Sequence, residues 1–349
     1  MFARHVKSLY ICKKFEANTH GSMLYISFPP GLPDKRLPFY LAAEEYVARK
    51  GIEEDCFFMW QVNPTVIFGR NQLIENEVNL DYCRKHGIEV YRRKSGGGCV
   101  YADRKNIMFS YITHQESVGF TYNRYITMVM HMLHRLGVNA TASGRNDIMI
   151  GDRKVSGSAF YKIPGCSIVH GTMLYDTDMQ NMVGAITPSD AKLLSKGVQS
   201  VRQRIALLKD YINLDIEAFK AFAKEALCNG ERCLDEADLT CIEEIEKEYL
   251  TDEFIYGCNP RYSVVRKGRI EGVGEMVARV ELKNGLIKGI SLMGDYFLTG
   301  DLDRGLLDRL KDVPLTAEAL SHALPDRVDD IIMNLKKNDL IKLLTDQTE

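Results

Sequence analysis

A run of three glycines between strand-like segments constrains the fold of this chain more than any other feature of its sequence. The stretch EVYRRKSGGGCVYADRKNIMFSY runs from Glu89 to Tyr111, and Arg92, Arg93 and Lys94 stand just before the serine and the glycines. Glycine adopts positive φ and lets a ligand approach the backbone, and consecutive N–H groups can form an anion-binding nest. A plain glycine-rich hairpin loop explains the pattern equally well. The pattern alone therefore predicts two strands joined by a loop and leaves the ligand open.

Two common phosphate-binding motifs do not fit this stretch. A Walker A loop requires Gly-Lys followed by Ser or Thr, and this triplet does not follow at the required spacing. A G-x-G-x-x-G fingerprint opens a helix, whereas strand-like residues follow these glycines. If an anion binds here, Arg93 is the side chain placed to clamp a phosphate with two parallel hydrogen bonds.

The order of periodic segments predicts an α+β fold in two parts. Apolar residues recur at helical spacing in 37–51 and 121–137, and strand-like segments lie between such helices. After an acidic helical stretch at 235–250 the sequence changes to strand residues and turns, including the hairpin signal Asn284-Gly285. The predicted parts are an N-terminal extension at 1–22, a large mixed-sheet domain at 23–250 and a small α+β domain at 251–349.

Composition narrows the class of protein. The 349 residues are 45% hydrophobic and 26% charged, with a formal net charge of −2, so the global basic field of many nucleic-acid-binding proteins is absent. No apolar run approaches the roughly 18 residues of a membrane span. Nine scattered cysteines without C-x-x-C spacing indicate reduced thiols inside a cell. We expect a cytoplasmic protein without nucleic-acid or membrane partners; the mitochondrial matrix is the alternative, since residues 1–22 are basic.

A second stretch, SGRNDIMIGDRKVSGSAFYK at 143–162, combines charged and small residues. Asn146 and Asp147 precede a strand and offer an amide and a carboxylate, which are oxygen ligands that a hydrated Mg²⁺ accepts. Lys154 follows in a second strand-like piece, and the small residues after it let a ligand pack against the backbone. A simple turn also accounts for the Asn-Asp pair, so this stretch does not settle its role alone.

Two further stretches are ambiguous in the same way. CSIVHGTMLYD at 166–176 places His170 inside an apolar strand, where a histidine is more often a satisfied core residue than a ligand-binding one. SKGVQSVRQRIALL at 195–208 carries Lys196 and Arg202, and a charge run of this kind usually forms a solvated surface.

Together these stretches resemble a known family. RRKSGGGCVYADRKN, GRNDIMIGDRKVSGSA, VHGTML and LLSKGVQSVRQRI occur in the order and spacing found in lipoate–protein ligases, and the resemblance extends from about Met23 to the C-terminus. It implies a biotin/lipoate ligase-like catalytic domain with a small C-terminal accessory domain. It also implies an enzyme that uses ATP and Mg²⁺ to convert lipoate into lipoyl-AMP, and then acylates a lysine of an acceptor domain.

The resemblance also implies the partners and the roles of individual residues. The acceptors would be E2 subunits of 2-oxo-acid dehydrogenases and the glycine cleavage H protein, and a monomer is expected. The ATP- and lipoyl-adenylate-binding positions would be Arg93, Gly98, Cys99, Val100, Tyr101, Asn146, Asp147 and Lys154. The lipoyl pocket would include Ser95, Gly96, Gly97, Ser156, Gly157, His170, Gly171 and Thr172. The loop covering the adenylate would contain Lys196, Ser200, Val201 and Arg202.

Within that set, Lys154 is the candidate catalytic residue and Asp147 the candidate magnesium ligand. Adenylation develops negative charge on the α-phosphate, and a fixed ammonium in a water-poor site stabilises such charge. A protein nucleophile is not required, because ATP supplies the leaving group.

Alternative functions on the same scaffold stay open at this point. A cysteine-dependent octanoyl- or lipoyl-transferase needs an activated thiol, which in such relatives precedes the segment that matches Gly144 to Asp147; here that stretch, GVNATASGRND, has no cysteine. An amidotransferase that takes preformed lipoyl-adenylate is not excluded. A biotin ligase would carry a GRGRxGR-type loop in place of RRKSGGG, and a module that only binds lipoylated proteins would not need an ATP site.

Overall fold

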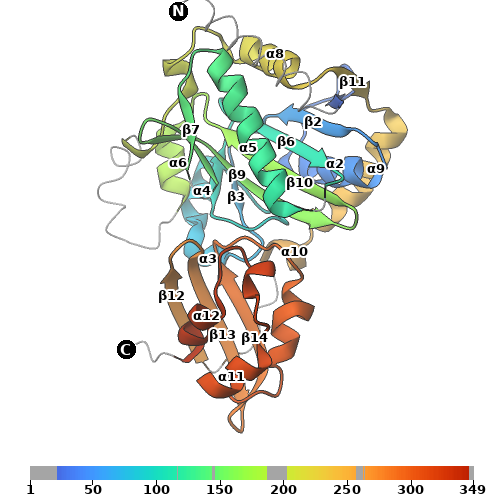
Figure 1. Cartoon of the computed structure of the whole chain (residues 1–349). Helices are drawn as coiled ribbons and strands as arrows, with labels where there is room; N and C mark the ends of the chain where they lie inside the picture. Colours follow the sequence, from blue (N-terminus) through green and yellow to red (C-terminus); the bar gives the residue numbers. More distant parts are fainter. Residues whose placement is uncertain are drawn as a thin grey trace, which may run out of the picture.

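The computed structural model describes residues 22–115, 117–143, 146–186, 203–256, 262 and 264–345. Figure 1 shows a larger part that contains a mixed sheet and a smaller part below it that ends in the C-terminal helices. The predicted α+β class is therefore confirmed. Within the described residues, no helix combines the length and the apolar character needed to cross a membrane. The cytoplasmic location stays a prediction.

The larger part is built on an eight-stranded sheet with the order β11-β1-β2-β6-β10-β9-β8-β7. The strand β1 pairs in parallel with both of its neighbours, and the other pairings are antiparallel. The strands are β1 (Met23–Ser27), β2 (Asp55–Trp60), β6 (Ile107–Thr113), β7 (Ala140–Ala142), β8 (Asp147–Ile150), β9 (Arg153–Ile163), β10 (Cys166–Met173) and β11 (Gly230–Cys233).

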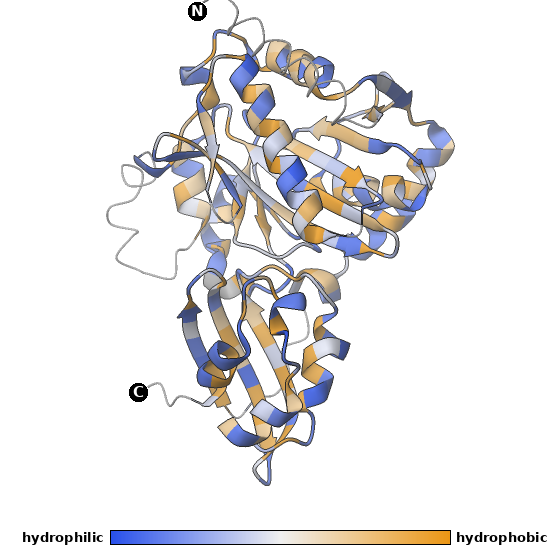
Figure 2. Cartoon of the chain, in the orientation of Figure 1, coloured by the Kyte–Doolittle hydropathy of each residue, from blue (hydrophilic) through white to orange (hydrophobic). Residues whose placement is uncertain are grey.

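Alternation along the central strands divides the core between the two faces of this sheet. Phe57 and Phe109 pack in one cluster with the helices α5 (Val118–Arg135) and α8 (Ile216–Leu227). Phe58 and Trp60 lie in a second cluster with α2 (Leu37–Arg49) and α9 (Glu236–Tyr249). In Figure 2 the strands between these helices are mainly coloured as hydrophobic.

The acidic helical stretch at 235–250 forms α9, and one face of this helix is buried. Leu239, Ile242 and Tyr249 are buried on one of its faces, and α9 packs along α2. Asp235 begins the helix with a capping box completed by Asp238. These three apolar side chains on one helical face pack against the core, although most of the stretch is charged or polar.

A second, three-stranded sheet carries the glycine run. Its order is β4-β3-β5, with β3 (Thr65–Phe68) between β4 (Glu89–Arg92) and β5 (Val100–Ala102). The glycines therefore join two strands, as predicted. The helix α4 (Leu80–His86) leads into β4 and ends at Gly87, which adopts a φ of 63°. The sheet packs in the same core cluster as Trp60, so it faces the large sheet across a shared interior.

The smaller part has its own hydrophobic core around a three-stranded antiparallel sheet. Its strands are β12 (Val264–Ile270), β13 (Gly274–Lys283) and β14 (Leu286–Gly294), and its helices are α11 (Ala317–Ala323) and α12 (Lys337–Thr345). Asn284 and Gly285 both have positive φ between β13 and β14, which confirms the predicted hairpin turn.

The connection between the parts runs through α10 (Asp252–Tyr256), whose Ile255 belongs to a core cluster of the larger part. The division into 1–22, 23–250 and 251–349 stays a prediction. The remaining short helices are α3 (Ile74–Glu77), α6 (Met179–Ala185), η2 (Leu208–Asp210), η3 (Asp303–Leu307), η4 (Asp308–Leu310) and η5 (Val328–Asp330).

Candidate functional site

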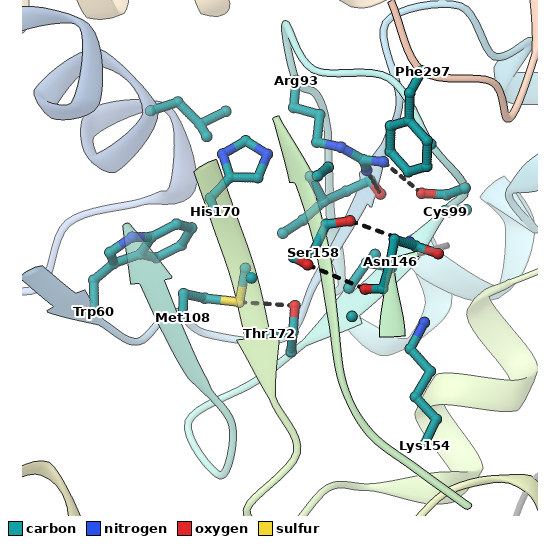
Figure 3. Close-up of a pocket in the computed structure, with 18 residues that line it drawn as sticks. Trp60, Arg93, Cys99, Met108, Asn146, Lys154, Ser158, His170, Thr172 and Phe297 are labelled. Carbon is teal, nitrogen blue, oxygen red and sulfur yellow. Dashed lines mark hydrogen bonds between the residues drawn. The ribbon is translucent and has the colours of Figure 1, made fainter. Parts of the chain in front are cut away.

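A pocket of about 100 Å³ lies between the two sheets of the larger part (Figure 3). Many of the residues singled out from the sequence line it: Arg93, Gly97, Gly98, Cys99, Val100, Asn146, Lys154, Gly157, His170, Gly171 and Thr172. Stretches that are distant in the sequence thus meet at one place. This convergence favours a ligand site over separate structural roles, because each stretch alone had a plain explanation.

The other predicted site residues lie behind or beside this lining. Ser95 and Ser156 are buried, and Tyr101 is part of a core cluster. Gly96 lies against the backbone of Tyr296, and Asp147 pairs with a lining residue. The positions assigned to the adenylate-covering loop, Lys196, Ser200, Val201 and Arg202, lie outside the described residues.

The Arg93 guanidinium is directed at the protein's own glycine loop. It donates to the carbonyls of Gly96 and Gly98 at 2.7 Å each, and to Ile67 O at 3.0 Å. Its Nε donates to Ser95 Oγ at 2.9 Å. Burial lowers the pKa of Arg93 to about 10, so the group stays charged at neutral pH. Arg93 thus fixes the shape of the loop, and its role as a phosphate clamp stays a prediction.

The two cations beside it are also engaged within the protein. Arg92 donates from Nε to Ile255 O at 2.9 Å and from Nη1 to Gln72 O at 2.9 Å. Lys94 lies 2.7 Å from both Glu45 Oε1 and Glu248 Oε2. These two side chains contact α2, α9 and α10, whereas Arg93 points to the glycines. The cation run therefore joins the glycine loop to the connection between the two parts.

A buried polar chain supports the wall of the pocket formed by His170. His170 Nδ1 lies 3.0 Å from Glu44 Oε2, and His170 Nε2 lies 2.7 Å from Ser95 Oγ. These are the spacings of a serine–histidine–carboxylate triad. However, Ser95 has 0% exposure and accepts a hydrogen bond from Arg93, so its hydroxyl does not face a ligand. This series of hydrogen-bonded side chains holds His170 in position and does not supply a nucleophile.

Lys154 stands at the opposite end of the pocket from Trp60 in Figure 3. Its Nζ lies 2.7 Å from Asp147 Oδ1 across the β8–β9 pairing. A Cβ on Gly157 would lie 2.5 Å from that Nζ, so the missing side chain makes room for the ammonium. The backbone of Ile205 bridges to that of Lys154, which brings a residue from the fourth stretch beside the site.

The described residues contain no group of three or more His, Cys, Asp or Glu side chains placed to hold a metal ion. Asp147 offers one carboxylate, and one of its oxygens already faces Lys154. Asn146 donates to Ser158 O at 3.1 Å. Mg²⁺ in proteins is often held by one or two carboxylates together with substrate phosphates, so Asp147 fits such an ion only when a nucleotide brings it. Magnesium stays a prediction.

Several lining residues were not singled out from the sequence: Leu41, Trp60, Ile67, Met108 and Phe297. Ser158 and Ala159, which also line the pocket, belong to the small residues after Lys154 that were expected to let a ligand approach the backbone. Trp60 is the single tryptophan of the chain; its Nε1 donates to Ser110 Oγ at 2.8 Å and its ring stacks on Tyr40. Its place in the strand-like run CFFMWQV was a usable signal, since alternation puts it on the same face as Phe58. Phe297 had no such signal, because it comes from the smaller part.

The pocket thus has two chemically different ends. Trp60 and Met108 lie at one end, and Asn146 and Lys154 lie at the other (Figure 3). An elongated apolar ligand with a polar or charged end group fits this arrangement.

The chain matches two families of known proteins along its length. Residues 37–228 match the family described as the lipoyl protein ligase A/B catalytic domain. Residues 259–344 match the bacterial lipoate protein ligase C-terminus. Lipoate–protein ligase 1 of Staphylococcus aureus is 37% identical over 80% of this chain and 89% of its own length. Lipoate-protein ligase LplJ of Bacillus subtilis is 34% identical over 75% and 82%, respectively.

Solved structures agree with these matches. LipL1 of P. falciparum in complex with lipoate has a TM-score of 0.74, covers 94% of this chain and 100% of its own, and is 22% identical, which shows a shared fold. A bi-partite lipoate protein ligase from Thermoplasma acidophilum, studied with its E2 lipoyl domain, is 26% identical and has a TM-score of 0.61. The match covers 70% of this chain and 100% of that chain. Lipoate-protein ligase A bound with ATP is 26% identical and has a TM-score of 0.57. The match covers 68% of this chain and 99% of that chain. The chain therefore belongs to the lipoate–protein ligase family and is an enzyme of the ligase class.

Proposed function

We propose that this ligase uses ATP to convert lipoate into lipoyl-AMP and pyrophosphate, and then transfers the lipoyl group to a specific lysine of acceptor domains. The acceptors are E2 subunits of 2-oxo-acid dehydrogenases and the glycine cleavage H protein. The observation that carries the proposal is a pocket that leads from Trp60 at its apolar end to the Lys154 ammonium at its polar end. The solved relatives with ATP and with an E2 lipoyl domain support the same reaction.

The two ends of the pocket suit the two ends of lipoate. The acyl chain and its dithiolane ring are apolar, and side chains such as Leu41, Trp60 and Met108 bury apolar surface. The carboxyl group then lies toward Asn146 and Lys154. A rigid apolar slot with few polar groups at one end fixes both the depth and the orientation of such a ligand.

The Lys154 ammonium stabilises developing negative charge in both steps of the reaction. In the first, a carboxylate oxygen of lipoate attacks the α-phosphorus of ATP and pyrophosphate leaves with the electron pair of the broken bond. In the second, the acceptor amine attacks the acyl carbonyl, loses a proton, and AMP leaves. Negative charge grows on oxygens beside the reacting centre in each case, and a fixed ammonium stabilises it. Asp147, at 2.7 Å, holds the ammonium in place.

Magnesium would enter this site with the nucleotide. Asp147 is the described carboxylate next to Lys154, and it would contribute a ligand to an ion whose other ligands include phosphate oxygens. The ion would neutralise phosphate charge. Asn146 would orient the polar end of the ligand through the amide that now donates to Ser158 O.

The thioester alternative requires an activated thiol, and Cys99 is the cysteine that lines the pocket among the described residues. Burial raises the pKa of the Cys99 thiol, and the nearby Glu77 carboxylate raises it further, against a smaller opposing effect of Arg93. A raised pKa keeps the sulfur protonated at neutral pH, whereas a nucleophile needs the thiolate. Cys99 is therefore expected to act through its backbone, as part of the glycine loop.

Changing Cys99 to alanine is expected to leave most of the ATP-dependent ligation activity intact. Alanine keeps the backbone N–H and removes only a protonated thiol. The rate of lipoyl transfer to an acceptor domain measures the effect, with intact-mass spectrometry of the wild type as the control. Loss of transfer in the variant, together with an acyl adduct on Cys99 in the wild type, would make the enzyme a thioester transferase.

Exchange of labelled pyrophosphate into ATP tests the proposed function directly. We expect exchange that requires lipoate, followed by lipoylation of an added acceptor domain. An amidotransferase would lack exchange yet acylate the acceptor from synthetic lipoyl-AMP. A transferase would acylate it without ATP from another acylated protein. Light scattering of the same sample tests the expected monomer.

A further inference from the structure

Three polar side chains line the pocket toward its Trp60 end: Trp60 itself, His170 and Thr172 (Figure 3). Each could offer a hydrogen bond to a ligand, yet each is already engaged within the protein. The Trp60 indole Nε1 donates to Ser110 Oγ at 2.8 Å, and Thr172 Oγ1 donates to Met108 Sδ at 3.3 Å. His170 has a partner at both ring nitrogens. The far end of a ligand in this part of the pocket therefore meets ring carbons and the Met108 thioether.

The hydrogen bonds of Trp60 and His170 converge on one buried carboxylate. Ser110 Oγ, which accepts from Trp60, donates to Glu44 Oε1 at 2.6 Å. His170 Nδ1 lies 3.0 Å from Glu44 Oε2, and both Glu44 and Ser110 have 0% exposure. A carboxylate only accepts hydrogen bonds, so the Ser110 proton faces Glu44 and Nδ1 carries the imidazole proton.

The other ring nitrogen of His170 completes the series. Ser95 Oγ lies 2.7 Å from His170 Nε2 and accepts from Arg93 Nε at 2.9 Å. With the imidazole proton on Nδ1, Nε2 accepts the Ser95 proton, so each link of the series has one donor and one acceptor. The Glu44 series, as we name it, consists of Arg93, Ser95, His170, Glu44, Ser110 and Trp60.

Stability alone gives a poor account of Glu44. The helix α2 buries it together with apolar side chains such as Leu41 and Val47. A buried carboxylate is unfavourable unless it is hydrogen-bonded, and well-packed apolar residues in place of buried charges often stabilise a fold. The two rings that Glu44 holds, directly or through Ser110, are both pocket walls. Its position is therefore better explained by the ligand than by the core.

We infer that Glu44 and Ser110 are positioning residues that set the specificity of the acyl pocket. By holding the polar hydrogens of Trp60 and His170, they present apolar surface to the far end of the ligand, so the enzyme rejects acids with a polar end group. A hydroxyl there would leave water without gaining a partner, and an apolar pocket rejects such a group on the order of 10²-fold. This inference rests on the proposed function for the ligand and its direction in the pocket.

Binding of octanoate and 8-hydroxyoctanoate to the full-length enzyme tests the inference. Octanoate has the eight-carbon chain of lipoate without its sulfur atoms, and the added hydroxyl lies at the far end of that chain. The fluorescence of Trp60, the single tryptophan, gives both dissociation constants without ATP. In the wild type their ratio should favour octanoate on the order of 10²-fold.

Changing Glu44 to glutamine should narrow that ratio on the order of tenfold. The amide has nearly the shape of the carboxylate but offers a single acceptor oxygen, and it points N–H groups at the other donor. One polar hydrogen of the Glu44 series then loses its partner and becomes available to the hydroxyl of the ligand. A variant that merely loosened the fold would weaken both acids alike and leave their ratio unchanged.

Two further variants separate this role from a general effect of removing a buried charge. Glu45→Gln changes the adjacent glutamate, which is equally buried but pairs with Arg49 and Lys94, and its ratio should equal that of wild type. Ser110→Ala removes the acceptor of the indole N–H and should narrow the ratio as Glu44→Gln does. It should also shift the indole N–H signal in the NMR spectrum, which is unambiguous because the chain has one tryptophan.

Two results would overturn the inference. Equal affinity of the wild type for the two acids would show that the pocket does not reject a polar chain end. A wild-type ratio in folded Glu44→Gln, or in Ser110→Ala if the first variant does not fold, would show that other groups cause the rejection. Lipoate-dependent pyrophosphate exchange by the wild type is measured separately. Its absence would overturn the proposed function, whereas the two affinities are measured without ATP and decide the inference by themselves.

Discussion

Changing Lys154 to alanine is expected to abolish both adenylate formation and lipoyl transfer in a protein that still folds. Its ammonium is the cationic group at the polar end of the pocket, 2.7 Å from Asp147, and both transition states develop negative charge there. Removing one preorganised donor from such a site typically lowers the rate on the order of 10²–10³-fold. The two steps are measured separately, by lipoate-dependent pyrophosphate exchange and by transfer from synthetic lipoyl-AMP.

Two further variants refine this test. Lys162→Ala removes an exposed lysine from the same strand β9 and should leave both rates unchanged. Gly157→Ala keeps Lys154 but places a methyl group 2.5 Å from the present position of Nζ, so the ammonium must move and both rates should fall. Near-normal adenylate formation by folded Lys154→Ala would contradict the catalytic assignment.

Changing Arg93 to methionine is expected to lower the free energy of unfolding by about 3 kcal/mol, because buried acceptors left without a partner cost about 1–3 kcal/mol each. The lost donors serve the carbonyls of Ile67, Gly96 and Gly98. The glycine loop should then lose its fixed shape, so lipoate affinity should fall as well. Urea unfolding followed by Trp60 fluorescence gives the first quantity, and lipoate titration gives the second.

Arg84→Met is the matched control, because that side chain is 77% exposed and pairs with Asp81 on the surface of α4. Surface pairs of this kind contribute little, so its unfolding should resemble that of wild type. If Arg93→Met unfolds like wild type but no longer binds nucleotide, Arg93 serves the phosphate more than the loop, and the structural assignment made from its hydrogen bonds would be wrong.

Local signals determined much of the fold. The helical periods predicted at 37–51 and 121–137 appear as α2 (Leu37–Arg49) and α5 (Val118–Arg135). The predicted turn at Asn284 and Gly285 is present. Such features depend on neighbours within a few residues, through side-chain spacing and backbone preference. The ligase family was also recognisable from short stretches whose order along the chain is informative even when each stretch is ambiguous.

Tertiary structure decided which groups the three cations beside the glycines contact. The sequence placed Arg92, Arg93 and Lys94 next to a bare backbone, which is typical of an anion site. In the fold their partners include Ile255 and Glu248, more than 150 residues away in the chain. Local sequence does not specify which distant carbonyls or carboxylates will reach a side chain, because that depends on how helices pack.

The residues at the two ends of the pocket also divide into those that the sequence indicated and those that only the fold revealed. His170 stood out in the sequence because it interrupts an apolar strand, and Lys154 stood out because small residues follow it in a strand-like piece. Trp60 and Met108 looked like ordinary core residues, and only the placement of the second sheet opposite them turns their side chains into a pocket wall. Phe297 enters from a separate hydrophobic unit. Its place in the pocket lining depends on a contact between two parts that each have their own hydrophobic core, and a chain's local periodicity carries no information about such a contact.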